Sequence, residues 1–304
     1  MTDAADTSQI TPRKGPGSFS RFVKEFCASP VAVVGFVVLL AIIVCAVFAP
    51  WIAPQDPYDL AKVSILDSRL PPGTPSMDGY TFWLGTDGLG RDMLSAILYG
   101  LRISLMVGAM SAVVALAIGA LVGLTAAYVG GRVDTIIMRI VDLQMSFPAI
   151  LVALMLLAVV GRGVDKTMIA LVIVQWAYYA RTVRGSALVE REREYIDAAR
   201  GLRLGHWRIL TRHLLPNCLA PLLVVGTIQV AAAITLEATL SFLGIGLPET
   251  EPSLGLLIAN GYQYLLSGLY WISIFPGLAL LATVLAINLV GDRLRDVLNP
   301  GERR

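Results

Sequence analysis

One run of 23 residues without a charge, VAVVGFVVLLAIIVCAVFAPWIA at residues 31–53, most strongly limits what this chain can fold into. About 20 apolar residues in a helix, each rising ~1.5 Å, cross the ~30 Å hydrocarbon core of a bilayer. The whole chain has the same character, because 56% of its 304 residues are hydrophobic and 15% are charged. Soluble domains carry about 25% charged residues. We therefore predict an all-α integral membrane protein.

Five further apolar runs bring the predicted total to six transmembrane helices. They lie at residues 103–129, 135–160, 167–180, 215–236 and 270–290. The run at 167–180 is short, and Lys166 and Arg181 at its ends can extend it by reaching toward the interfaces. A cleaved signal peptide is the alternative for the first run, but a polar lead of thirty residues fits it poorly.

The distribution of Lys and Arg predicts the orientation, because cytoplasmic loops attract basic residues. With a cytoplasmic N-terminus, 18 of the 24 basic residues lie inside and six lie outside. The residues counted as inside include Arg13, Lys14, Arg303 and Arg304, and those outside include Lys62. Both ends are then cytoplasmic, with tails at residues 1–30 and 291–304.

Two outer segments follow from this topology. Residues 54–102 are rich in Pro, Gly and Asp and form a loop, with an interfacial helix within GRDMLSAILYGLRISL at 90–105. Residues 248–268 carry Glu249 and Glu251 and no basic residue. The transmembrane core at 103–290 would hold the second to sixth helices.

A charged cytoplasmic segment at 181–214 interrupts the apolar runs. Tyr195, Ala198, Ala199 and Leu202 recur at helical spacing, which predicts a short helix with a small apolar face beside Asp197. Such a face suits docking of another protein, although an amphipathic segment can also lie on anionic headgroups. Glycines then loosen the chain, and a second helix starts near His206. The candidate docking residues of this segment are Asp197, Ala198, Ala199, Gly201, Leu202, Gly205, Leu215 and Pro216.

Polar residues inside the predicted spans are candidates for a solute path. Glu237 lies late in the fifth span, where an unpaired charge costs about 2.5–3.5 kcal/mol at the bilayer centre. It must face protein or water, either on the path or in the outer gate. Gln144, Asn260 and Gln263 are further path candidates.

Two local features concern the helices themselves. Arg139 and Asp142, three residues apart, predict an interfacial ion pair. Pro148 and Pro276 predict kinks inside spans.

The chain lacks the motifs that several classes of protein require. No lysine follows a glycine, so a Walker A loop is absent and ATP must be hydrolysed elsewhere. HExxH is absent and the two histidines, His206 and His213, lie in the cytoplasmic segment, which argues against a membrane metalloenzyme. A self-sufficient secondary transporter is disfavoured because no internal repeat is evident. The three cysteines, Cys27, Cys45 and Cys218, have no paired spacing.

The segment DAARGLRLGHWRILTRHLLPN at 197–217 resembles the EAA loop of permease subunits in ATP-driven (ABC) importers. Asp197, Ala198, Ala199, Leu215 and Pro216 match its pattern, while Arg203 occupies the family's glycine position. Three other segments are similar to the second permease subunit of dipeptide, oligopeptide and nickel importers: FWLGTDGLGRDMLSAILYGLRISL at 82–105, LEATLSFLGIGLP at 236–248 and NLVGDRLRDVLNP at 288–300. The PQDP at 54–57 agrees with this resemblance.

The resemblance implies the type I permease architecture of ABC importers in a bacterial cytoplasmic membrane. It implies a homologous permease, two cytoplasmic ATPase subunits and an extracytoplasmic solute-binding protein as partners, with lipid around them and no nucleic acid. ATP and Mg²⁺ would bind the ATPases, and this chain would hold no cofactor or metal. Peptides are the expected solute, while relatives carry nickel, glutathione or other compounds.

Overall fold

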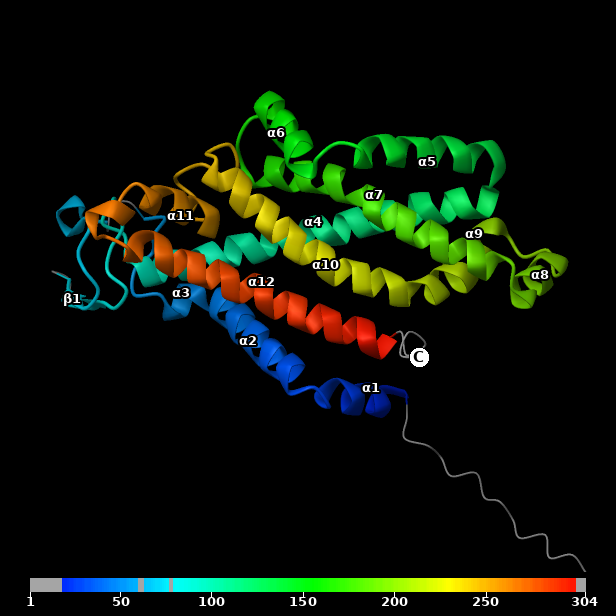
Figure 1. The fold of residues 1–304 in the computed structure, drawn as a ribbon, viewed down its shortest axis with the longest axis horizontal. Coiled ribbons are helices and arrows are strands. Elements are labelled where there is room, and N and C mark those ends of the chain that lie inside the picture. The colour runs from blue at the N-terminus through cyan, green and yellow to red at the C-terminus, as the bar shows by residue number, and fades with distance from the viewer. Residues whose placement is uncertain (1–17, 60–62, 77–78, 299–304) are drawn as a thin grey trace, which may run out of the picture.

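The computed structural model of the protein describes residues 18–59, 63–76 and 79–298. Of the predicted tails at 1–30 and 291–304, residues 1–17 and 299–304 lie outside the described residues. So do five basic residues used for the orientation: Arg13, Lys14, Lys62, Arg303 and Arg304. The long helices are α2 (Pro30–Val47), α4 (Met93–Val129), α5 (Gly131–Met145), α6 (Ala149–Val160), α7 (Val164–Arg191), α10 (Leu215–Phe242) and α12 (Trp271–Leu298). Helices α4, α7, α10 and α12 run along the long axis of the molecule (Figure 1).

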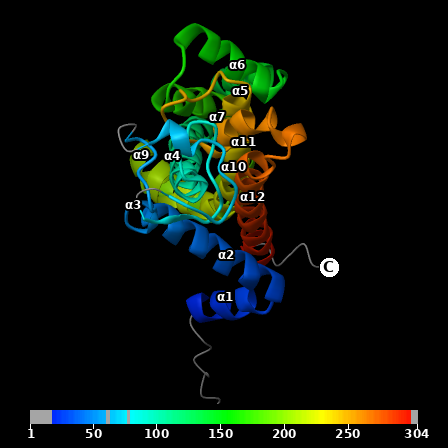
Figure 2. The ribbon, with the colours of Figure 1, turned by 90° about the vertical axis from the view of Figure 1, so that its left-hand side faces the viewer.

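Shorter elements gather at the two ends of this bundle. The helices among them are α1 (Ser18–Cys27), α3 (Ala49–Ile52), α8 (Glu194–Gly201), α9 (His206–Ile209) and α11 (Leu254–Tyr262). Single 3-10 turns lie at Ile65–Asp67 and Leu265–Ser267, and a π-helical turn lies at Leu210–Leu214. Strands β1 (Thr74–Pro75) and β2 (Thr81–Phe82) pair antiparallel, with Thr74 opposite Phe82. Helix α8 lies at the end where α12 finishes, and α3, α11 and the strands lie at the other end (Figures 1 and 2).

Apolar length by itself accounts for up to five membrane spans among the described residues. Helices α2, α4 and α12 and the α9–α10 segment each pass, and α5 with α6 forms a fifth apolar unit bent by 88° at the break between them. Pro148 lies at this break, so the predicted kink is a sharp turn. The predicted six would take α7 as the remaining span; this helix is less apolar because six of its 28 residues are charged, and ten of its side chains are buried within the bundle.

Helices α4 and α7 cross at close range. A Cβ atom on Gly119 would lie 2.4 Å from the carbonyl oxygen of Trp176, and one on Gly123 would lie 2.4 Å from that of Ala180. Small residues four apart let two backbones approach in this way. The GxxxG spacing therefore sets how deeply α7 sits against α4.

The predicted interfacial helix of the outer loop is continuous with the helix of the second span. Residues 93–101 are not an interfacial helix of their own but the first turns of α4, and Met93, Ile97 and Leu101 are buried. Likewise, the first predicted span at 31–53 is broken at Phe48 into α2 and α3. The outer segment instead folds into a cap whose side chains bury the start of α4.

Two glycines of the WLGTDGLGRD sequence make this cap possible. Gly85 and Gly90 have φ angles of +79° and +84°, which favour glycine. A Cβ on Gly90 would lie 2.2 Å from the carbonyl oxygen of Ser64. This close packing encloses an Arg91–Asp87 ion pair, at 2.7 Å and almost fully buried.

Candidate functional site

Helix α8 is held against the body of the bundle by apolar side chains. Ile196 and Ala199 on α8 are 0% and 4% exposed, and Ile209 on α9 is 1% exposed. They join a cluster with residues of α4, α7 and α10, including Leu124, Ala127, Tyr179, Val183, Ala187, Cys218 and Leu222. The helix therefore rests on the ends of three long helices at once.

Hydrogen bonds tie α8 to the same helices. The Tyr195 hydroxyl donates to Glu190 Oε2 on α7 at 2.7 Å and accepts from Asn217 Nδ2 on α10 at 3.1 Å. Partial burial, followed by the Glu190 carboxylate, raises the pKa of Tyr195 to about 12. The hydroxyl is thus a stable donor to Glu190 at neutral pH.

A second set of contacts joins the ends of this segment to α4. The hydroxyl of Tyr128 and Nδ1 of His206 lie 2.7 Å apart, and Arg191 Nη1 donates to the carbonyl oxygen of Ala127 at 2.7 Å. The Arg200 guanidinium lies 5.8 Å from the centre of the Tyr128 ring. A displacement of α8 would therefore be transmitted to α4 as well as to α7 and α10.

The opposite side of α8 is open. Asp197, Ala198, Gly201 and Leu202 are exposed, with Leu202 at 75%. The predicted apolar face therefore divides, because Ala199 points into the bundle and not outward with Ala198. Ile196, which the sequence reasoning missed, is its inward partner three residues away. We define the outer face of α8 as Asp197, Ala198, Gly201 and Leu202.

The bend after α8 occurs at Arg203. Its φ is +53°, in the left-handed region that glycine adopts most easily. Gly201 and Gly205 have no positive φ, and a Cβ on either would meet no atom within 4 Å. Arg203 thus makes this turn, at the position where the resemblance places a glycine.

Beyond this turn the chain runs helically into α10 with no loop. Helix α9, the π turn and α10 follow one another directly, and Leu215 and Pro216 form the start of α10. Proline has no N–H and displaces the preceding helical turn, and the wide π turn just before Pro216 accommodates this. Movement of this segment therefore passes into α10 along a continuous helix.

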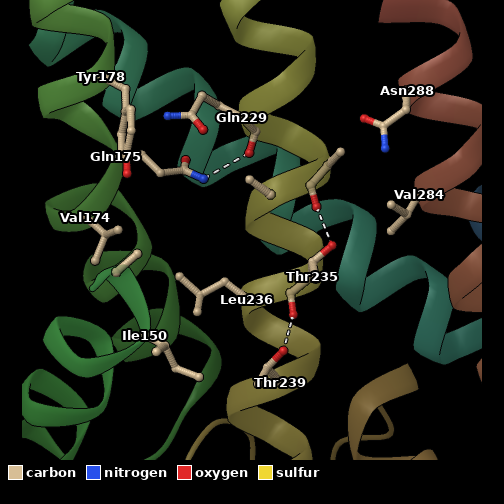
Figure 3. Close-up of a pocket in the computed structure, with 13 residues that line it drawn as sticks. Ile150, Val174, Gln175, Tyr178, Gln229, Thr235, Leu236, Thr239, Val284 and Asn288 are labelled. Atoms are coloured by element: carbon tan, nitrogen blue, oxygen red, sulfur yellow. Dashed lines mark hydrogen bonds between the residues drawn. The ribbon is translucent and has the colours of Figure 1, made fainter. Parts of the chain in front are cut away.

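A cleft of about 540 Å³ lies along α10, between α7 and α12, and six of its thirteen lining residues are polar (Figure 3). Its polar lining residues are Gln175, Tyr178, Gln229, Thr235, Thr239 and Asn288. The remaining lining residues are apolar, among them Ile150 of α6 and Val284 of α12. Sequence reasoning missed these polar residues, although an isolated glutamine within an apolar run was an available signal.

Glu237, the leading path candidate, lies outside this cleft. Its side chain is 0% exposed, and its two carboxylate oxygens accept from Ser104 Oγ on α4 at 2.9 Å and Ser241 Oγ at 2.8 Å. Among the described residues no basic group pairs with it. The carboxyl group joins α4 to α10.

The other path candidates are not lining residues of the cleft, although Gln144 lies beside it. Gln144 donates to carbonyl oxygens of Ile173 and Val174 on α7, and Asn260 and Gln263 lie at the end of α11. None of the three lines the cleft. The predicted Arg139–Asp142 pair is also wrong, because Asp142 pairs with Arg181 of α7 instead.

The sequence family described as "Binding-protein-dependent transport system inner membrane component" matches residues 115–304. A second family, "N-terminal TM domain of oligopeptide transport permease C", matches residues 18–72. The chain belongs to the first family and is a membrane permease subunit of an ABC importer. Membership implies a partner permease and ATPase subunits.

Curated relatives agree over most of the chain. A putative peptide transport system permease of Brucella suis is 45% identical, covering 88% of this chain and 86% of the relative. The di/tripeptide transport system permease of Pseudomonas aeruginosa is 38% identical, covering 94% and 93%. A permease chain in inward-facing structures of the MetNI methionine ABC transporter has a TM-score of 0.55 at 23% identity, covering 67% of this chain and 97% of that one. The structural likeness supports the type I permease fold.

Proposed function

We propose that this permease forms, with a homologous second permease, the path by which di- or oligopeptides cross the cytoplasmic membrane. The relatives named above include peptide and di/tripeptide permeases. The observation that carries the coupling half of the proposal is the two-sidedness of α8. One side is packed on α4, α7 and α10, while Ala198 and Leu202 face outward without cover.

In this proposal a separate ATPase subunit binds the outer face of α8. Closure of the ATPase dimer then displaces α8, and the packed inner side transmits the displacement to three helices. ATP and Mg²⁺ stay on the ATPases, so this chain binds no cofactor and is not itself an enzyme. A solute-binding protein delivers the solute to the capped end, and both termini are cytoplasmic.

Coupling is tested with Ala198→Arg in the assembled complex. The added side chain blocks the outer face of α8 without touching the buried side. We expect ATPase subunits to co-purify at a tenth of the parental yield or less, with uptake reduced to match. Ala28→Arg, an exposed alanine between α1 and α2, is the matched control and should leave both values unchanged. Full co-purification and uptake with Ala198→Arg would refute docking on this face.

The solute is tested separately by ATP-driven uptake into proteoliposomes that contain the full complex and its binding protein. We expect a labelled dipeptide to accumulate and Ni²⁺ or glutathione to remain outside. Accumulation of only Ni²⁺ or glutathione would remove the peptide assignment while leaving the importer intact.

A further inference from the structure

Gln175 of α7 and Gln229 of α10 meet in the lining of the cleft. Gln175 points from α7 toward α10, and Gln229 points from α10 back toward α7 (Figure 3). Gln175 Nε2 donates to the main-chain carbonyl oxygen of Gln229 at 2.9 Å. The two side chains are 3% and 7% exposed.

One hydrogen-bonding atom on each amide has no partner. Gln175 Oε1, an acceptor, and Gln229 Nε2, a donor, are both buried and unbonded. Buried polar groups in proteins are nearly always hydrogen-bonded, because an unpaired one keeps the cost of losing water. The hydrogen bond that joins α7 to α10 uses only Gln175 Nε2. A purely structural role therefore does not explain why Gln175 Oε1 and Gln229 Nε2 are buried without partners.

The rest of the cleft supplies no charge and few free donors. None of its lining residues in the described part of the chain is acidic or basic. Thr235 and Thr239 donate their hydroxyl protons to carbonyl oxygens of their own helix, at 2.9 and 2.7 Å. The charged ends of a peptide find no opposite charge among these residues and therefore stay in water at the open side of the cleft.

We propose that Gln175 and Gln229 bind one peptide group of the solute, Gln175 Oε1 accepting from its N–H and Gln229 Nε2 donating to its C=O. This inference rests on the proposed peptide solute. A peptide group carries one donor, one acceptor and no charge. It can therefore pair with both unbonded amide atoms without needing a charged partner in the cleft. The pair therefore recognises the backbone that all peptides share and ignores their side chains.

The experiment uses a dipeptide and its ester analogue, in which oxygen replaces the peptide N–H while the C=O remains. Binding of each to the purified permease–ATPase complex, without the binding protein, is measured by saturation-transfer NMR. The parental complex should bind the dipeptide about tenfold more tightly than the ester, the effect of one buried hydrogen bond.

The two glutamines should respond differently to replacement. Gln175→Leu removes the acceptor for the N–H, so dipeptide affinity should fall about tenfold and the preference over the ester should vanish. Gln229→Leu removes the donor to the C=O, which both compounds carry, so both affinities should fall about tenfold and the preference should remain. Gln263→Leu is the matched control outside the cleft and should change neither affinity.

Co-purification of the ATPases and basal ATP hydrolysis establish that each variant assembles. Equal binding of dipeptide and ester by the parental complex overturns the proposal, as does Gln175→Leu with the preference intact. If Gln175→Leu fails to assemble, Gln175→Asn, a shorter amide, replaces it with the same expectation for the preference. If the complex takes up the dipeptide but binds it no more tightly than the ester, this inference alone is wrong. If the complex takes up no dipeptide, the proposed function is wrong.

Discussion

At the residue scale, Glu237 shows how burial decides the role of a membrane carboxyl. Sequence places it late in a span, where it must meet protein or water. The structure gives it Ser104 and Ser241 as hydrogen-bond donors, and the cleft lies elsewhere. Its position thus favours a structural role over contact with solute.

Replacing Glu237 separates these roles. Glu237→Gln keeps the shape and the capacity to bond both serines, so we expect uptake to be unchanged and the melting temperature to be nearly so. Glu237→Leu leaves both hydroxyls without this partner and should cost about 1–2 kcal/mol, measured by thermal unfolding in detergent. A large loss of uptake with Glu237→Gln in a stable complex would contradict the structural role.

Ala199 shows a similar effect of position on α8. It matches the family's motif, yet its side chain is buried beneath the helix and makes no part of the outer face. We expect Ala199→Leu to overpack the cluster under α8 and to cost about 1–3 kcal/mol, seen as a lower melting temperature and faster proteolysis at residues 194–205. Ala198→Leu is the matched change on the exposed side and should leave both measurements close to parental.

At the element scale, the helices fit together through glycines and ion pairs. Gly119 and Gly123 set the α4–α7 crossing, and two ion pairs join α5 to α7. Arg184 binds both carboxylate oxygens of Asp134, at 2.5 and 2.6 Å, and Arg181 binds Asp142. The polar residues of α7 therefore face its neighbours, which explains why a span with several charges stays in the bundle.

Gly119→Ala tests the crossing. Because its Cβ would lie 2.4 Å from the Trp176 carbonyl oxygen, the two helices must separate, and we expect a loss of about 1–3 kcal/mol. Gly185→Ala on α7 meets no atom within 4 Å and should instead stabilise the protein by up to about 1 kcal/mol. Thermal unfolding of both variants checks this, and equal melting temperatures would show that the crossing tolerates a methyl group.

At the scale of the whole molecule, the bundle has a closed end and an exposed end. The cap is joined to the helices by Trp271 Nε1, which donates to the Thr86 carbonyl oxygen at 3.2 Å, and by Gln55, whose Oε1 accepts from the Asp92 N–H at 2.7 Å. At the other end, α8 is packed on one side only. Helix α4 therefore connects the two ends, because it begins in the cap and its last turns pack beneath α8.

Arg91 tests the cap. Arg91→Leu leaves the buried carboxylate of Asp87 without its partner and should cost about 3–5 kcal/mol, with rapid proteolysis between residues 63 and 92. Arg69→Leu removes only a cation–π contact, 4.9 Å from the centre of the Tyr264 ring, and should cost about 1 kcal/mol or less. If Asp87→Leu added to Arg91→Leu restored no stability, the unpaired charge would not be the cause.

The sequence by itself determined the membrane class, most of the spans and the presence of a short helix around Asp197. These follow from apolar length and local motifs. Apolar length is informative because a segment that crosses a bilayer must satisfy its backbone hydrogen bonds internally, and a helix does so. Only the tertiary structure decided that 93–101 belongs to α4, that Ala199 faces inward, that Asp142 pairs with Arg181, and that Gln175 meets Gln229. Each of these depends on which residues, far apart in the chain, come together on neighbouring helices, and helical periodicity within one segment carries no information about that.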